Sequence, residues 1–270
     1  MQKAILKLNH HNWHAYLRDE ADQSVFNEIF KLREYRVAEE VIKNAKNAVV
    51  DVGAHAGFFS MYCHSLNEKV KIYAVEPEPA NLKLLKQHLD ENKISGVEVV
   101  AVALASESGE RQLFLSADSH NHSLTPPNPP LKKGGINEPP LFKAGAGGGQ
   151  LVVQAFSFAD FCKKNKINKI SLLKMDIEGG EYEVFESMSA NDFAMVNYVI
   201  LEYHTSNKFY NLPAGRQGRL SSKHIEEKLR ANGFGVRIFP SRFDKTMGFI
   251  FANNKRANIN KSKFKNQNAK

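Results

Sequence analysis

Cysteine, tryptophan and long apolar runs are scarce in this 270-residue chain, which has two cysteines and one tryptophan. No segment approaches the roughly 18 consecutive apolar residues of a membrane helix, and the N-terminal residues lack the apolar core of a signal peptide. Cys63 and Cys162 fit neither a Cys-x-x-Cys motif nor a zinc-ligand spacing, so we interpret them as buried, reduced thiols. These absences predict a cytoplasmic protein without a membrane span or a cysteine-based active site.

Acidic residues are missing from the last 18 positions, and this accounts for most of the formal net charge of +8. Residues 253–270 contribute +6 to this net charge and residues 125–150 contribute +2, which leaves the rest of the chain formally neutral. A nucleic-acid-binding face on the folded body is therefore not expected. Residues 253–270 are predicted to be a basic disordered tail, with binding of RNA or anionic lipid as the alternative.

Apolar periodicity divides the rest of the chain into alternating strands and helices. Residues 1–46 have apolar positions at helical spacing and are predicted to be a helical segment that covers one edge or mouth of the core. Residues 47–252 are predicted to form one α/β domain, a doubly wound, mostly parallel sheet with one antiparallel strand supplied by a closing hairpin. Two segments lack the periodicity and are predicted to be insertions. Residues 125–150 are rich in Pro and Gly and are expected to be disordered, and residues 211–218 are the second insertion.

The individual elements follow from the same patterns. Buried strands are expected at 48–52, 70–75, 97–102, 170–176 and 198–203, a β excursion at 111–115 and 152–156, and the final hairpin at 236–239 and 247–251.

The most informative motif is an apolar strand that ends in an acid and a thin glycine turn, Val49-Val50-Asp51-Val52-Gly53-Ala54-His55-Ala56-Gly57. Glycine lets a ligand approach the backbone, and open α/β sheets bind ligands at the carboxyl ends of their strands. His55 replaces the second glycine of Gly-x-Gly-x-x-Gly, which disfavours a dinucleotide. The next strand ends at Glu76, before Pro77, where a carboxylate is placed to accept hydrogen bonds from both hydroxyls of a ribose. Together these features predict a nucleotide-type cofactor site.

Acidic side chains also end two later strands. Asp176 shares a strand face with Lys174, and Glu202 shares one with His204. If the two strands are neighbours, Asp176, Glu202 and His204 converge, either as candidates for a general base or as ligands of a divalent metal. The structural alternative is that Asp176 or Glu178 caps the helix that follows. His120 and His122 are predicted to be solvated loop residues, with the lining of an acceptor pocket as the alternative.

Three motifs together resemble the FkbM family of S-adenosylmethionine-dependent methyltransferases. They are Asp51–Gly57, Ala74–Pro77 and Leu173–Glu181, and the resemblance extends from about Tyr35 to Phe251. The family more often has Asn at the position of His55 and a single glycine near Gly180.

The resemblance implies a Rossmann-like methyltransferase fold with S-adenosylmethionine as the cofactor. We do not expect a metal, and a divalent ion at Asp176, Glu202 and His204 is the alternative. Gly53–Gly57 would pass under the methionine half of the cofactor, Glu76 would bind the ribose, and Ala103 would approach the adenine. The implied cofactor-binding residues are Asp51, Gly53, Ala54, His55, Gly57, Glu76, Pro77 and Ala103.

The implied reaction is methyl transfer to a hydroxyl oxygen of a sugar, glycan or small metabolite, with Asp176, Glu202 or His204 as the base. The expected partner is this small-molecule or carbohydrate acceptor, not a nucleic acid. Three other functions stay open from the sequence: a nucleic-acid methyltransferase, an NAD-dependent oxidoreductase and a cofactor-binding module without catalysis.

Overall fold

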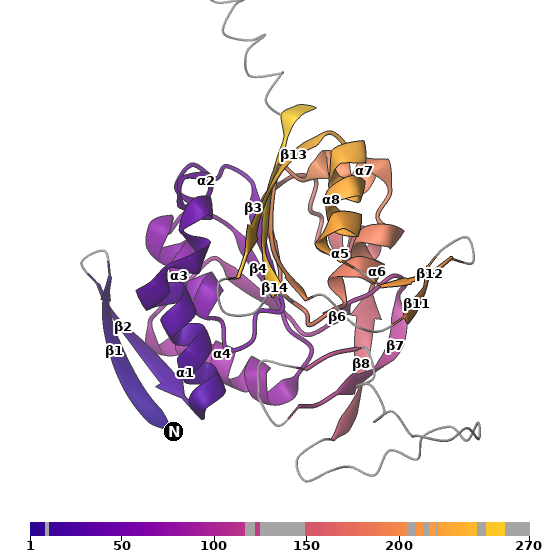
Figure 1. Cartoon of the computed structure of the whole chain (residues 1–270). Coiled ribbons are helices and arrows are strands. Elements are labelled where there is room, and N and C mark those ends of the chain that lie inside the picture. Colours follow the sequence, from indigo (N-terminus) through magenta and orange to yellow (C-terminus); the bar gives the residue numbers. More distant parts are fainter. Residues whose placement is uncertain are drawn as a thin grey trace, which may run out of the picture.

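The computed structural model of the chain is described here for residues 1–8, 11–116, 122–124, 149–204, 209–212, 216–219, 221–241 and 247–256. A seven-stranded sheet with the order β13-β14-β10-β9-β3-β4-β5 lies at its centre (Figure 1). The strands are β3 (Ala48–Val52), β4 (Ile72–Val75), β5 (Val97–Val100), β9 (Ile170–Met175), β10 (Tyr198–His204), β13 (Phe234–Pro240) and β14 (Met247–Asn254).

The sheet is parallel from β5 to β10, and β14 is antiparallel to both of its neighbours. The predicted doubly wound, mostly parallel sheet with one antiparallel strand is therefore confirmed. The chain runs outward from β3 through β4 to β5, and it returns to the other side of β3 with β9 and β10. The strand order thus reverses between β3 and β9, and open α/β sheets bind their ligands at such a point.

Helices cover both faces of the sheet, because its central strands are apolar on both sides. In Figure 1 the helices α1 to α4 lie on one face and α5 to α8 on the other. Val49 packs in the core cluster of the first face, and Val50, the next residue, packs in the cluster of the second. The helices are α1 (Glu20–Asn27), α2 (Glu39–Lys43), α3 (Phe58–Leu66), α4 (Pro79–Glu91), α5 (Phe158–Lys164), α6 (Glu181–Ser187), α7 (Ala190–Met195) and α8 (Ser222–Ala231).

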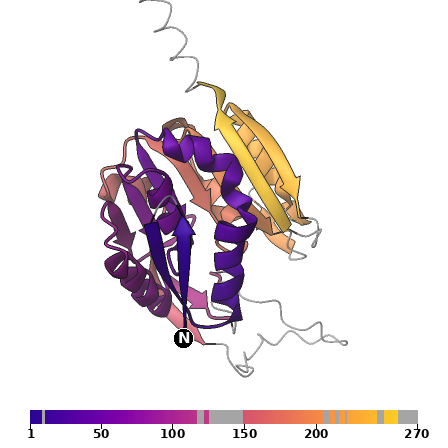
Figure 2. The same cartoon turned by 90° about the vertical axis from the view of Figure 1, so that its left-hand side faces the viewer.

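The N-terminal segment is not wholly helical, in contrast to the prediction for residues 1–46. It begins with an antiparallel hairpin of β1 (Gln2–Leu8) and β2 (His11–Leu17), which lies beside the helices of the first face (Figure 2). Trp13, Ala15 and Leu17 are buried, so β2 has the period of two that is typical of a half-buried strand. A π-helical turn η1 (Glu28–Leu32) and a 3₁₀ turn η2 (Glu34–Ala38) connect α1 to α2.

The predicted β excursion is present as a small second sheet. The strands β7 (Gly109–Phe114) and β8 (Gln150–Phe156) are antiparallel, and β6 (Ala103–Leu104) joins β8 in parallel. Of the predicted insertion at 125–150, only residues 149 and 150 are among those described, and Gln150 already belongs to β8. The other predicted insertion, 211–218, overlaps a short antiparallel pair of β11 (Phe209–Leu212) and β12 (Arg216–Arg219).

The end of the sheet extends past the predicted boundary of the basic tail. The strand β14 continues to Asn254, whose buried amide donates a hydrogen bond to the carbonyl oxygen of Val196 at 3.0 Å. Residues 257–270 lie outside the described part of the chain. Cys63 and Cys162 are both buried free thiols, as predicted. In the described residues, no helix has the length and apolar character needed to cross a membrane.

Candidate active site

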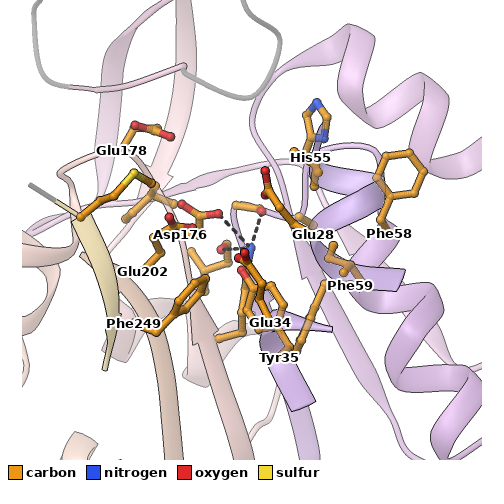
Figure 3. Close-up of a pocket in the computed structure, with 18 of the residues that line it drawn as sticks. Glu28, Glu34, Tyr35, His55, Phe58, Phe59, Asp176, Glu178, Glu202 and Phe249 are labelled. Carbon is orange, nitrogen blue, oxygen red and sulfur yellow. Dashed lines mark hydrogen bonds and ion pairs between the residues drawn. The ribbon is translucent and has the colours of Figure 1, made fainter. Parts of the chain in front are cut away.

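A cavity of about 1180 Å³ lies at the carboxyl ends of the central strands, where the strand order reverses. One side, which we name the cofactor wall, consists of the turn after β3, the end of β4 and the start of β6. The rest of the polar lining, which we name the acidic wall, carries carboxylates from η1, η2, β10 and the loop after β9 (Figure 3). The cofactor wall contains Gly53, Ala54, His55, Glu76, Pro77 and Ala103, and the acidic wall contains Glu28, Glu34, Asp176, Glu178 and Glu202.

The glycine turn after β3 is held by the sheet and packed against its neighbours. Gly53 has a φ of +71°, and a Cβ at this position would lie 1.8 Å from the carbonyl oxygen of Asp176. Gly57 has a φ of +84°, and a Cβ there would lie 2.9 Å from Cγ of Leu85. The sequence argument assigned these glycines to close approach of a ligand. The structure shows that the packing of β9 and α4 against the turn already requires them.

Asp51 lies beneath the turn and is not in the lining of the cavity. Its carboxylate accepts a hydrogen bond from Ser60 Oγ at 2.8 Å, and its Oδ1 lies 3.3 Å from Nζ of Lys174. Burial raises the pKa of Asp51, and the Lys174 ammonium partly offsets this increase. The structure therefore brings neither Asp51 nor Gly57 to the cavity surface, although the sequence grouped both with the cofactor-binding residues.

Lys174 connects β9 to the glycine turn. Burial lowers the pKa of Lys174, but the carboxylates of Asp51 and Asp176 more than offset this effect, so the pKa is raised and the side chain stays an ammonium. Its Nζ donates a hydrogen bond to the carbonyl oxygen of Gly53 at 2.8 Å and lies 4.0 Å from Oδ2 of Asp176. The cation thus lies between the buried Asp51 and the cavity-lining Asp176.

The carboxylate of Glu76, at the end of β4, lines the cavity and also organises its own wall. Its Oε2 accepts a hydrogen bond from the backbone N–H of His55 at 2.8 Å. Its Oε1 accepts from the backbone N–H of Glu78 at 2.9 Å and from Nδ2 of Asn81 at 3.3 Å. Burial raises the pKa of Glu76, and these donors oppose the rise. A carboxylate has about four acceptor positions, so the three protein donors leave Oε2 able to accept another hydrogen bond.

The predicted convergence at the ends of β9 and β10 is present for two of the three residues. Leu201 on β10 pairs with Met175 on β9. The next residue along each chain segment is Glu202 and Asp176, respectively, so these two residues lie side by side, and both line the cavity. Partial burial, with the nearby carboxylates of Asp176 and Glu28, raises the pKa of Glu202 to about 10. His204 ends β10, but its side chain lies outside the described residues. Among the side chains that are described, no three His, Cys, Asp or Glu residues group as metal ligands.

The loop between β9 and α6 is held by Glu181, and not by Asp176 or Glu178, which the sequence offered as helix caps. Glu181, fully buried, accepts hydrogen bonds from the backbone N–H groups of Ile177 at 2.8 Å and Gly179 at 2.9 Å. The helix α6 has no side-chain cap, so neither Asp176 nor Glu178 caps it. Glu178 adopts a left-handed φ of +55° and lines the cavity.

Comparison with known proteins identifies the group to which this site belongs. Residues 51–236, more than two thirds of the chain, match the methyltransferase FkbM domain. The chain belongs to the FkbM methyltransferase family. The match begins at Asp51 and includes the cofactor wall, Asp176 and Glu202.

The chain is also similar in sequence to three methyltransferases. It is 26% identical to methyltransferase sdnD of Sordaria araneosa over 73% of this chain and 80% of that protein. It is 25% identical to 31-O-demethyl-FK506 methyltransferase FkbM of Streptomyces tacrolimicus, over 67% of this chain and 74% of that one. It is also 25% identical to hexuronic acid methyltransferase AglP of Haloferax volcanii, over 66% of each chain.

Several cavity residues precede the FkbM match, and the sequence argument did not find them. Glu28 and Glu34 line the acidic wall, and Tyr35 lies between Phe59 and Phe249 with ring centroids 4.8 and 5.3 Å away (Figure 3). The helical apolar spacing indicated that this segment covers the mouth of the sheet, but no motif marked its polar residues. His122 also lines the cavity, which agrees with the alternative considered for this loop residue.

Proposed function

We propose that this FkbM-family methyltransferase uses S-adenosylmethionine to methylate a hydroxyl oxygen of a sugar, glycan or small metabolite. The observation that carries the proposal is that the Glu76 carboxylate and the backbone of Gly53–His55 face the same cavity as Asp176 and Glu202. A cofactor and an acceptor held on the two walls would meet in this space. Two relatives support the choice of oxygen acceptors, since one is named for a 31-O position and another for hexuronic acid.

The residues present fit this cofactor. The cavity is at or above the upper end of the roughly 300–1,000 Å³ usual for small-molecule sites, so it has room for a cofactor together with an acceptor. Glu76 retains an acceptor position for a ribose hydroxyl, and the small residues Gly53, Ala54 and Ala103 leave the wall open to a flat ligand. Asp176 follows the strand next to β3 and lines the same cavity, where its carboxylate complements a positively charged sulfonium.

When bound, S-adenosylmethionine supplies an electrophilic methyl group whose sulfur leaves with the electron pair of the broken C–S bond. Asp176 is the base in our proposal, and it takes the proton of the acceptor hydroxyl as the new C–O bond forms. Glu202 holds its own proton near neutral pH because its pKa is raised. It is therefore suited to orient the acceptor by donating a hydrogen bond, and unsuited to remove a proton.

Binding and transfer are tested separately. We expect calorimetry to detect S-adenosylmethionine binding, and the Glu76→Ala variant to bind it much more weakly. Glu98→Ala, on the adjacent strand β5, removes a carboxylate that does not line the cavity and serves as the control. Incubation of the wild-type protein with methyl-labelled S-adenosylmethionine and sugars, glycans or small hydroxylated metabolites then identifies the acceptor by mass. Absence of binding would refute the proposal, and binding without any acceptor-dependent transfer would indicate a non-catalytic module.

A further inference from the structure

The N-terminal segment reaches the cofactor wall through side chains that precede the FkbM match. Arg18, just after β2, and Asp22, in α1, form a two-point ion pair, in which Nε and Nη2 of Arg18 lie 2.9 and 2.8 Å from the carboxylate oxygens of Asp22. Asp22 is fully buried. Burial by itself raises the pKa of Asp22, but the bonds from Arg18 and His55 outweigh burial and hold this pKa well below its usual range. The carboxylate is thus ionised and points to the interior of the protein.

This ion pair contacts two residues of the cofactor wall. Nη2 of Arg18 donates a hydrogen bond to Oδ1 of Asn81 at 2.8 Å and lies 3.1 Å from Nε2 of His55. The same His55 nitrogen lies 3.2 Å from Oδ1 of Asp22. The side chains of His55 and Asn81 are therefore both fixed from the N-terminal segment.

His55 and Asn81 are also two of the residues that hold Glu76. The backbone N–H of His55 and the side-chain amide of Asn81 donate to opposite oxygens of its carboxylate, at 2.8 and 3.3 Å. A closed ring of polar contacts therefore runs from Glu76 through His55 to the ion pair and returns through Asn81. His55 has a left-handed φ of +51°, a conformation that is uncommon for a non-glycine residue and costs backbone energy.

A second connection joins the hairpin to the same turn. The backbone N–H of Tyr16 donates to Nε2 of His88 at 2.8 Å, and Nδ1 of His88 lies 2.7 Å from the carbonyl oxygen of Ala56. Because Nε2 accepts, Nδ1 carries the proton and donates to Ala56, so the ring is neutral. Burial lowers the pKa of His88, which agrees with this assignment. Two adjacent residues of the turn after β3, His55 and Ala56, are thus tied to residues 16–22.

We propose that Arg18 and Asp22 are positioning residues of the cofactor site, which fix His55 and Asn81 and through them orient the carboxylate of Glu76. The inference rests on the proposed S-adenosylmethionine site. It assigns to the N-terminal segment a function in cofactor affinity, in addition to its cover of the sheet. Neither Arg18 nor Asp22 lines the cavity beside Asp176 or Glu202. The inference therefore predicts an effect on cofactor binding and not on the acidic wall.

The test uses the full-length chain with Asp22→Asn and Arg18→Lys. The first variant removes the charge that holds Arg18 and His55, and the second keeps the charge but loses the planar fork that reaches both Asp22 and Asn81. We expect each to weaken calorimetric binding of S-adenosylmethionine and S-adenosylhomocysteine by about tenfold or more, as lost hydrogen bonds to charged groups do. The KM for the acceptor and kcat at saturating cofactor should change by less than about twofold, because the acidic wall is intact.

The control is Glu226→Gln, which breaks another i,i+4 ion pair with an arginine, Arg230 in α8, away from the cavity. This variant should bind both ligands like the wild type. Unchanged ligand affinity in folded Asp22→Asn and Arg18→Lys, even with a lower Tm, would overturn the inference and leave these residues a structural role alone. If Asp22→Asn does not fold, Arg18→Lys decides the matter by itself. Failure of the wild type to bind either ligand would instead refute the proposed function.

Discussion

The ammonium of Lys174 donates a hydrogen bond to the carbonyl oxygen of Gly53 at 2.8 Å, so a buried cation on β9 holds the turn that follows β3. Asp51, its register partner on β3, balances the charge from within the sheet. The position of the turn therefore depends on a buried ion pair, one partner of which, Lys174, also lines the cavity. A buried ion pair need not increase stability over an apolar pair, but the loss of one partner leaves the other charge uncompensated.

The Lys174→Met variant should lose much of the stability of the protein. Asp51 would be left as a buried carboxylate with Ser60 as its hydrogen-bond donor, and such losses cost about 3–5 kcal/mol. Urea unfolding gives the difference in free energy of unfolding. Lys71→Met is the control, because Lys71 and Glu98 form an ion pair of 2.7 Å whose side chains are both nearly half exposed. Exposed pairs contribute about 0–1 kcal/mol, and an equal loss in the two variants would contradict the argument.

The Gly53→Ala variant should be far less stable than the Gly96→Ala variant. The two glycines have similar left-handed φ values of +71° and +83°, so both substitutions strain the backbone. A Cβ at Gly96 meets only the carbonyl oxygen of Val70, at 3.5 Å, whereas one at Gly53 would overlap the backbone of Asp176. We expect a loss of about 1 kcal/mol at Gly96 and several times as much at Gly53, measured as the free energy of unfolding. Similar losses would show that the end of β9 can shift without cost.

Asp176→Asn and Glu202→Gln should separate the base from the residue that orients the acceptor. If Asp176 accepts the proton, the amide cannot replace it, and kcat should fall by about 10²–10⁴. Glutamine has nearly the shape of protonated Glu202 and still donates a hydrogen bond, so kcat in Glu202→Gln should fall by less than about tenfold. Labelled methyl transfer at saturating substrates measures both values. The reverse order of effects would assign the base to Glu202.

The sequence predicted the central sheet and the cofactor wall because their signals are local. Gly53, His55 and Glu76 each lie within a few residues of an apolar strand end, so strand periodicity placed them at one edge of the sheet. Asp176 and Glu202 were brought together by the same argument once their strands were taken as neighbours, and this is confirmed by the register of β9 and β10.

The contribution of the N-terminal segment depends instead on contacts between residues far apart in the chain. Tyr16 bonds to His88, and Arg18 bonds to Asn81, each more than 60 positions further along the chain. No local sequence pattern predicts which distant side chain such a residue will contact. The alternation of buried and exposed positions in β2 covers only a few residues, so the hairpin was included in the predicted helical segment 1–46. A motif shows that a residue is required but not whether a ligand or a neighbouring strand requires it, so the cofactor-binding roles of Asp51 and Gly57, which do not line the cavity, stay predictions.

The stability of the Glu202→Gln variant should exceed that of the wild type near neutral pH. The pKa of Glu202 is raised in the folded protein, so the folded state keeps a proton that the unfolded state releases above a pKa of about 4.3. Stability from this group is therefore fully present below that pKa and is lost as the pH rises towards the folded value. Glutamine has no proton to release, so the variant avoids this loss.

Urea unfolding at several pH values between about 4 and 8 tests this sign. The advantage of Glu202→Gln over the wild type should be small at the acidic end and should grow with pH, by at most about 1.4 kcal/mol per pH unit for a single proton. Glu110→Gln, at an exposed position in β7, is the control and should show no such trend. A constant difference across the range would mean that Glu202 is ionised in the folded protein, and Glu202 would then compete with Asp176 as the base.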